Sequence, residues 1–152
     1  MSVECVVFVG LPASGKSTFY QERFAATHTH VSKDLLPKSA NKSERQARDL
    51  RAALGASRSV VVDNTNPAVA DRADIIRLAR ELGARVIGYY FAASPRECVG
   101  RNRGREGTAR VPPVAIFTAA KRLVVPVKAE GFDELWRVTI RTDGGFDVES
   151  MV

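Results

Sequence analysis

The sequence predicts an α/β fold, a three-layer sandwich in which helices cover both faces of a mainly parallel sheet. Short apolar runs alternate along the chain with segments whose apolar residues have helical spacing, as in repeated strand–helix–strand units. The run SVVVDN at 59–64 is of the kind that parallel sheets bury on both faces. The first apolar run leads directly into a glycine-rich loop that ends in Lys-Ser. We expect a single domain over residues 1–152, without repeats or linkers.

The first half of the chain is expected to hold three strands and two helices. Apolar residues fill VECVVFV at 3–9, and HTHVSKD at 28–34 indicates a short strand. A helix should follow Asn41, because Asn41 can cap it and Glu44 stands three positions later. We therefore place strands at 3–9, 28–34 and 59–64, and helices at about 16–26 and 41–55.

The second half of the chain continues this alternation. Asn66 as the N-cap and Pro67 at the first position start a helix that Gly83 ends. Ser94 and Pro95 start another helix, which gives way to a glycine- and arginine-rich segment. We place strands at 85–92 and 135–142, helices at 67–82 and about 113–123, the arginine-rich segment at about 100–113, and an edge extension at FDVES.

The loop after the first strand has the spacing G-x-x-x-x-G-K-S, from Gly10 to Ser17. Its glycines let the backbone approach an anion closely, and its amides and the next helix's N-terminus can point at phosphates. Lys16 adds a positive charge toward the β and γ phosphates, and the Ser17 hydroxyl can ligate Mg²⁺. The motif therefore predicts a nucleoside triphosphate site. Its residues are Gly10, Pro12, Ala13, Ser14, Gly15, Lys16, Ser17 and Thr18.

Two acids follow the second and third strands, at the sheet edge where α/β proteins bind ligands. Asp34, in VSKDLLP, can accept the proton of an attacking hydroxyl as a general base; alternatively it is an N-cap or a loop acid. Asp63 closes VVVD and can orient Mg²⁺ or its waters, although DNTNP is also good turn chemistry. Asp63 and Asn64 are also candidates for contacting the substrate.

The segment at about 100–113 buries no apolar face, because its arginines alternate with glycine, asparagine and threonine. These arginines are Arg101, Arg103, Arg105 and Arg110. On a lid, such side chains can close over a triphosphate and stabilise charge in the transition state. The alternative is a solvated charged loop.

The composition indicates which class of partner the protein binds and in which compartment it is found. The net charge of +6 favours an anionic partner, and no apolar stretch approaches the roughly 20 residues that cross a bilayer. Cys5 and Cys98 have no partners at metal-ligand spacing, and His28 and His30 are expected to be structural. We see no secretory leader and no evident protein partner, and we expect a cytoplasmic protein.

Several stretches together resemble the kinase domain of the polynucleotide 5′-hydroxyl kinases, within the P-loop kinases. They are GLPASGKSTF, VSKD, VVVDNTNP with DRADIIRLARELGARV, RNRGREGTARVPP and EGFDELWRV, and they cover nearly the whole chain in the expected order. The resemblance implies a P-loop NTPase-type sheet of order 2-3-1-4-5 and phosphoryl transfer from ATP with Mg²⁺ to a hydroxyl. Lys16 and Ser17 match the phosphate-loop pair, Asp34 matches the general base, and Arg105 or Arg103 matches the catalytic lid arginine.

One position departs from that family's pattern. Three residues after the base, where an arginine grips the substrate's phosphate, this chain has Pro37, with Lys38 next. Lys38 can supply the charge but not a bidentate fork. Three functions stay open: a polynucleotide 5′-kinase, a kinase for a small hydroxylated metabolite or nucleoside, and a non-enzymatic nucleotide switch. The sequence does not choose DNA over RNA.

Overall fold

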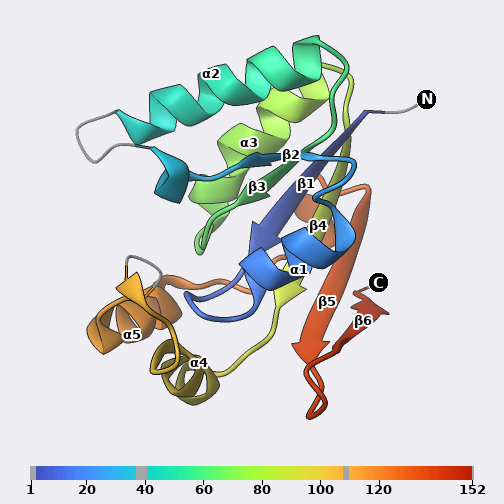
Figure 1. Ribbon diagram of the computed structural model, residues 1–152. Helices are drawn as coiled ribbons and strands as arrows, with labels where there is room; N and C mark the ends of the chain where they lie inside the picture. Colours follow the sequence, from blue (N-terminus) through green and yellow to red (C-terminus); the bar gives the residue numbers. More distant parts are fainter. Residues whose placement is uncertain (1–2, 37–40, 108–109, 152) are drawn as a thin grey trace.

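The computed structural model describes residues 3–36, 41–107 and 110–151. At its centre is a six-stranded sheet in the order β2-β3-β1-β4-β5-β6 (Figure 1). The strands are β1 (Glu4–Val9), β2 (Thr29–Val31), β3 (Val60–Asp63), β4 (Arg85–Phe91), β5 (Glu134–Ile140) and β6 (Phe146–Ser150). Strands β1 to β5 run parallel, and β6 pairs antiparallel with β5. The expected fold and the order 2-3-1-4-5 are confirmed, with β6 added at the edge.

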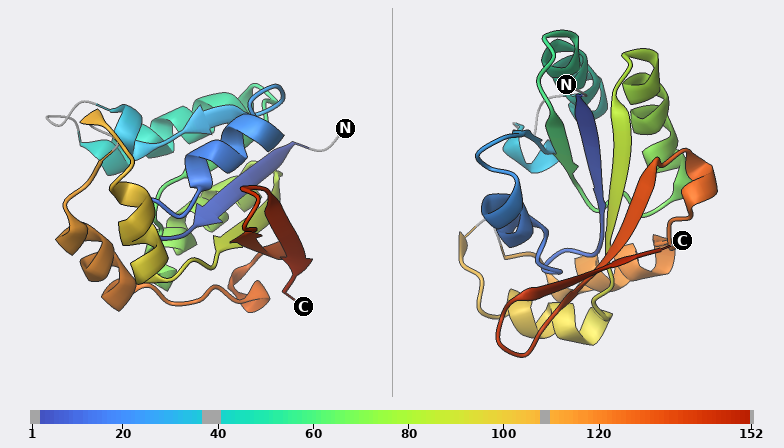
Figure 2. Two further views of the ribbon diagram at one scale, coloured as in Figure 1. Left: turned by 60° about the horizontal axis from the view of Figure 1, so that its bottom comes forward. Right: turned by 90° about the vertical axis from the view of Figure 1, so that its right-hand side faces the viewer.

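Helices cover both faces of this sheet, as Figure 2 shows from two further directions. Helices α2 (Lys42–Gly55) and α3 (Val69–Glu81) lie on one face, and α1 (Lys16–Arg23) lies on the other. Helices α4 (Pro95–Asn102) and α5 (Pro113–Arg122) lie beyond the carboxyl ends of the strands (Figure 1). The predicted three-layer sandwich is therefore present, with a helical pair at the edge where ligands bind.

The core follows the alternation of side chains along the central strand. Cys5, Val7 and Val9 of β1 pack with α2 and α3, whereas Val6 and Phe8 pack with α1. Successive residues of a strand point to opposite faces, so β1 is buried on both sides. A third cluster fixes α4 and α5 to the loop after β1. Its buried members are Leu11, Cys98 and Ile116.

Two expected elements have different limits in the structure. β2 ends at Val31 because the chain turns at once into the 3₁₀ helix η1 (Lys33–Leu35), which contains Asp34. The helix expected from Pro67 begins at Val69 instead. Asn66 as its N-cap was therefore wrong: its φ is 45°, and its Nδ2 donates to the carbonyl of Phe8 at 2.8 Å.

The arginine-rich segment is shorter than expected, because α4 continues to Asn102 and α5 begins at Pro113. Both amide atoms of Asn102 bond the backbone of Val111: Nδ2 donates to its carbonyl at 2.6 Å, and Oδ1 accepts from its N–H at 2.9 Å. The side chain of Asn102 thus closes the base of the connecting loop. Within the described residues, no helix is long and apolar enough to cross a membrane.

Candidate active site

The glycine-rich loop curls into a concave turn between β1 and α1. Ala13 and Gly15 have left-handed φ values of 64° and 96°, and the chain enters α1 directly after Gly15. A Cβ at Gly10 would lie 2.8 Å from both the Cβ of Phe91 and the Oγ of Ser14, so this position has no room for a side chain. The Oγ of Ser14 is buried without a hydrogen-bond partner. A phosphate oxygen in the loop could satisfy this hydroxyl, so the loop fits the triphosphate that the motif predicts.

The side chain of Lys16 folds back onto the start of the phosphate loop. Its ammonium donates to the carbonyls of Gly10 at 2.9 Å and Leu11 at 2.7 Å. A phosphate bound in the curl of the loop would therefore meet this positive charge as well as the backbone amides.

The carboxyl end of β3 brings a carboxylate to the start of α1. The Oγ of Ser17 donates to Oδ2 of Asp63 at 3.5 Å, and Asp63 is only 5% exposed. A hydroxyl beside a carboxylate offers the hard oxygen ligands that Mg²⁺ prefers, and Mg²⁺ takes its other ligands from phosphates and water. The pair therefore fits the metal site predicted for Ser17 and Asp63. Among the described residues, no group of three or more His, Cys, Asp or Glu forms a metal cluster.

Both amide atoms of the next residue, Asn64, form hydrogen bonds with other residues of the protein. Its Oδ1 accepts from the backbone N–H of Lys33 at 2.8 Å, and its Nδ2 donates to Oε1 of Gln46 at 2.5 Å. Asn64 thus ties η1 to α2, and its predicted contact with substrate stays a prediction. Asp34 lies in η1 next to this anchor, but its side chain, like the whole of Lys38, lies outside the described part of the chain.

The turn after β3, residues 63–67, joins the parts of the site to one another. Besides the contacts of Asp63 and Asn64, the carbonyl of Thr65 accepts from the N–H of Gly10, and the carbonyl of Pro67 accepts from Val124. The residues of this turn therefore hold several segments, so the turn sets the spacing between the phosphate loop, η1 and the end of α5.

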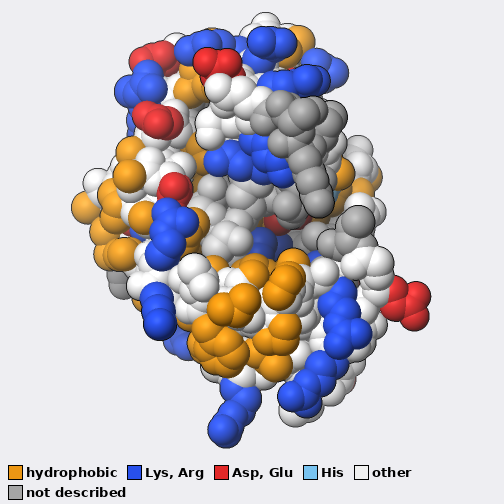
Figure 3. Space-filling model, turned by 90° about the vertical axis from the view of Figure 1, so that its left-hand side faces the viewer, with side chains coloured by type: hydrophobic (Ala, Val, Ile, Leu, Met, Phe, Trp, Pro, Cys, Tyr) orange, Lys and Arg blue, Asp and Glu red, His pale blue; other side chains and the backbone are white. Residues whose placement is uncertain are grey.

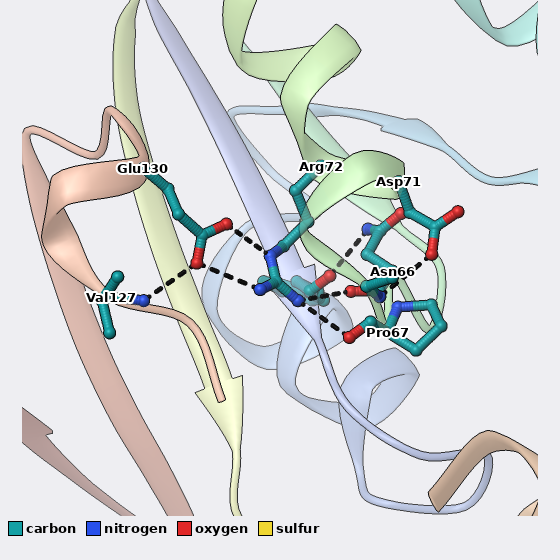
Figure 4. Close-up of polar contacts among 8 residues, drawn as sticks. Asn66, Pro67, Asp71, Arg72, Val127 and Glu130 are labelled. Carbon is teal, nitrogen blue, oxygen red and sulfur yellow. Dashed lines mark hydrogen bonds and ion pairs between the residues drawn. The ribbon is translucent and has the colours of Figure 1, made fainter. Parts of the chain in front are cut away.

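A buried arginine supports this turn from α3 (Figure 4). Arg72 is fully buried and pairs with Glu130 through two bonds, Nε to Oε1 at 2.8 Å and Nη2 to Oε2 at 3.0 Å. Its Nη1 donates to the carbonyls of Asn66 at 2.9 Å and Pro67 at 3.1 Å. Such bidentate, fully paired geometry is what a buried charge requires. The short helix η3 (Lys128–Glu130) is thereby fastened to the turn.

A comparison with protein families matches residues 5–126 to a family described as an AAA domain. The chain belongs to this AAA domain family. The phosphate loop, the turn at 63–67 and helices α4 and α5 all fall within the matched part of the AAA domain.

A curated relative is similar to this chain over almost the whole length of this chain. The bifunctional polynucleotide phosphatase/kinase of Schizosaccharomyces pombe is 30% identical over 142 residues, which are 91% of this chain. The AAA domain chain spans only 34% of that relative's length. The resemblance noted in the sequence is confirmed by this match.

Solved structures share the fold of the AAA domain at low identity. A gluconokinase from Sinorhizobium meliloti matches with a TM-score of 0.63 and 17% identity, over 90% of this chain and 82% of its own. A fungal RNA kinase matches with a TM-score of 0.63 and 18% identity, over 94% of this chain and 78% of its own. These two proteins have differently named activities on one fold, so the fold alone does not choose the acceptor.

The four arginines of the segment at about 100–113 differ in their burial, and only Arg101 has a buried nitrogen without a partner among the described residues. Arg103 and Arg110 are exposed and Arg105 is half-buried, whereas Nη1 of Arg101 is buried without a hydrogen-bond partner. Arg101 belongs to α4, whose Cys98 packs against Leu11 of the loop after β1. Burial raises the pKa of Cys98, and the positive charges of Lys16, Arg101 and Arg105 lower it in part. The roles predicted for Arg103 and Arg105 stay predictions, and the unpartnered Nη1 makes Arg101 a further candidate.

We therefore predict that Arg101→Ala lowers the rate of phosphoryl transfer more than Arg103→Ala does. An unpaired, partly buried guanidinium can bind a phosphate without giving up another partner, so its loss should cost about 10- to 100-fold in kcat. Exposed Arg103 serves as the matched control from the same segment. Equal effects of the two substitutions, measured with labelled ATP, would contradict this prediction.

Proposed function

We propose that the chain is an ATP- and Mg²⁺-dependent kinase that phosphorylates the 5′-hydroxyl of a polynucleotide. The observation that carries the proposal is the contact of Ser17 with Asp63 at 3.5 Å, beside the turn that anchors η1 and Asp34. The proposal is supported because the phosphate loop, the Ser17–Asp63 pair and η1, which contains Asp34, follow the carboxyl ends of the neighbouring strands β1, β3 and β2. That the chain is a P-loop phosphotransferase follows from its family, its phosphate loop and its kinase relatives.

The residues have separate roles in this reaction. The acceptor's oxygen attacks the γ-phosphorus, the bond to the β–γ bridging oxygen breaks, and ADP leaves. Asp34 takes the proton of the attacking hydroxyl, while Lys16 and the loop amides neutralise the phosphoryl oxygens. Bound Mg²⁺ would supply further positive charge to the β and γ phosphates, held through Ser17 and Asp63. Arg101 adds charge from α4.

A polynucleotide acceptor is supported by the matched relative and by the net charge of +6. Figure 3 shows a hollow on one face, with Lys and Arg side chains around it and apolar side chains gathered below it, over α5. The exposed large apolar residues of α5 are Val114 and Phe117. Basic and apolar walls together suit a strand with phosphates and bases.

A kinase for a small hydroxylated metabolite or nucleoside is the second candidate, favoured by Pro37 at the position where an arginine would grip a substrate phosphate. The deciding experiment incubates the protein with labelled ATP and a panel of acceptors: 5′-hydroxyl DNA and RNA oligonucleotides, nucleosides and sugars. Labelling of an oligonucleotide end supports the proposal. Labelling confined to a nucleoside or a sugar would replace it with the second candidate.

Salt should affect an oligonucleotide acceptor far more than a small one. Each phosphate contact to a single strand lowers log affinity by about 0.7 per decade of salt, so two or three contacts should raise KM about tenfold for a fourfold rise in salt. Lys38→Ala should flatten this dependence without changing the KM for ATP. The measurement is KM at several salt concentrations with ATP held saturating; a flat profile for the unmodified protein would contradict the predicted phosphate contacts.

A further inference from the structure

His30, on the edge strand β2, reaches across to the carboxylate at the end of β3. Its Nε2 lies 2.8 Å from Oδ2 of Asp63, the same oxygen that accepts from Ser17. An ionised carboxylate can only accept hydrogen bonds, so Nε2 of His30 must carry the hydrogen and donate it. The expectation that His30 is simply structural overlooked this contact.

The imidazole of His30 is itself held by α1. The ring of Tyr20 stacks on it, with 4.1 Å between ring centroids and 17° between the planes. The hydroxyl of Tyr20 donates to the carbonyl of His28 at 2.6 Å, which fixes the phenol beside the chain that leads into β2. Burial and then the charge of Asp63 raise the pKa of Tyr20, so the phenol keeps the proton that it donates. The ring plane of His30 is thus set before any ligand binds.

This arrangement constrains how the carboxylate of Asp63 can turn. His30 and Ser17 both engage Oδ2, whereas Oδ1 accepts no hydrogen bond from the described residues. Asp63 is nearly buried, so a carboxylate without this donor would turn to find another or would meet the ligand in several orientations. Hydrogen bonds from neighbouring side chains commonly orient metal-binding carboxylates, and their loss weakens metal binding.

We propose that His30 is a positioning residue, which holds the Asp63 carboxylate in the orientation that binds Mg²⁺ together with ATP. The proposal rests on the proposed function, since it assigns Ser17 and Asp63 to the metal. It gives Tyr20 a part as well, because the stacked phenol holds the imidazole in plane. Neither side chain touches the reacting atoms.

The test measures nucleotide binding rather than turnover. ATP is titrated calorimetrically into the protein with EDTA and again with saturating Mg²⁺, and the ratio of the two affinities gives the gain due to the metal. His30→Phe keeps a ring on Tyr20 but donates no hydrogen bond, so the gain should fall about tenfold while metal-free ATP binding is unchanged. His30→Gln restores a donor and should recover most of the gain.

A second histidine of the chain provides the matched control. His28 makes a similar contact to Glu4 at 2.9 Å, before the start of β2 and away from Asp63. His28→Gln should keep the full metal-dependent gain, and thermal melting verifies that each variant is folded. An unchanged gain in His30→Phe would overturn the proposal, and so would an equal loss of ATP affinity with and without Mg²⁺.

The outcome for His30 is separable from the outcome for the proposed function. The metal-dependent gain is measured without any acceptor, so it stands even if no oligonucleotide is phosphorylated. If the unmodified protein binds ATP with a metal-dependent gain but labels no oligonucleotide, the polynucleotide acceptor is wrong. If it labels oligonucleotides and His30→Phe keeps the full gain, the role of His30 is wrong.

Discussion

Lys16→Ala is expected to abolish turnover. The ammonium of Lys16 bonds the carbonyls of Gly10 and Leu11, which places its charge at the mouth of the phosphate loop. No other loop side chain carries a positive charge. Losing one such charge-stabilising contact typically costs about 10²-fold or more in rate. The measurement is kcat with labelled ATP under saturating conditions.

The control for this substitution is Lys128→Ala, which removes an exposed lysine of η3, outside the phosphate loop. Both variants lose one positive charge, so a general effect of net charge should appear in both. Near-normal kcat in Lys16→Ala would contradict the assignment of the loop as the site of phosphoryl transfer.

Asp34→Asn should separate catalysis from nucleotide binding. The amide cannot accept the acceptor's proton, so phosphoryl transfer should fall by about 10²- to 10⁴-fold, the usual range for a general base. ATP binding should stay nearly intact, because Asp34 is in η1 rather than in the phosphate loop. Equilibrium titration of ATP and single-turnover rates measure the two effects separately.

The competing explanation makes the opposite prediction for the same variant. If Asp34 only caps a turn, asparagine caps equally well and the rate should barely change. Asp49→Asn, at an exposed position on α2, is the matched control for removing one carboxylate. A rate equal to that of the control would rule out Asp34 as the base.

The sequence predicted the phosphate loop well because all of its determinants are contiguous. The motif occupies eight consecutive residues and includes Gly10, Gly15, Lys16 and Ser17. Its local spacing alone specifies the loop. The sheet was predictable for a similar reason, since its buried strands are short apolar runs between helices. Here local pattern and global fold agree.

The contacts that the sequence missed join residues far apart along the chain. His30 and Asp63 meet only because β2 and β3 pair in parallel, with His30 opposite Val61. Asn66 was assigned as a cap because asparagine before proline is typical of a helix start. Its amide binds Phe8 of β1 instead, and its carbonyl serves the buried Arg72. Partners of that kind depend on tertiary packing, which no local spacing reveals.

The turn at 63–67 and the loop between α4 and α5 should differ in how well they tolerate inserted residues. Most residues of the turn at 63–67 make a hydrogen bond to another segment of the chain. One added residue would therefore shift Asp63 relative to the residues that follow it in the turn. The connection between α4 and α5 is closed at its base by Asn102 and Val111, and lengthening a loop whose ends are fixed costs little free energy. Length variation among proteins with this fold should therefore gather between α4 and α5, while the turn after β3 keeps a constant length.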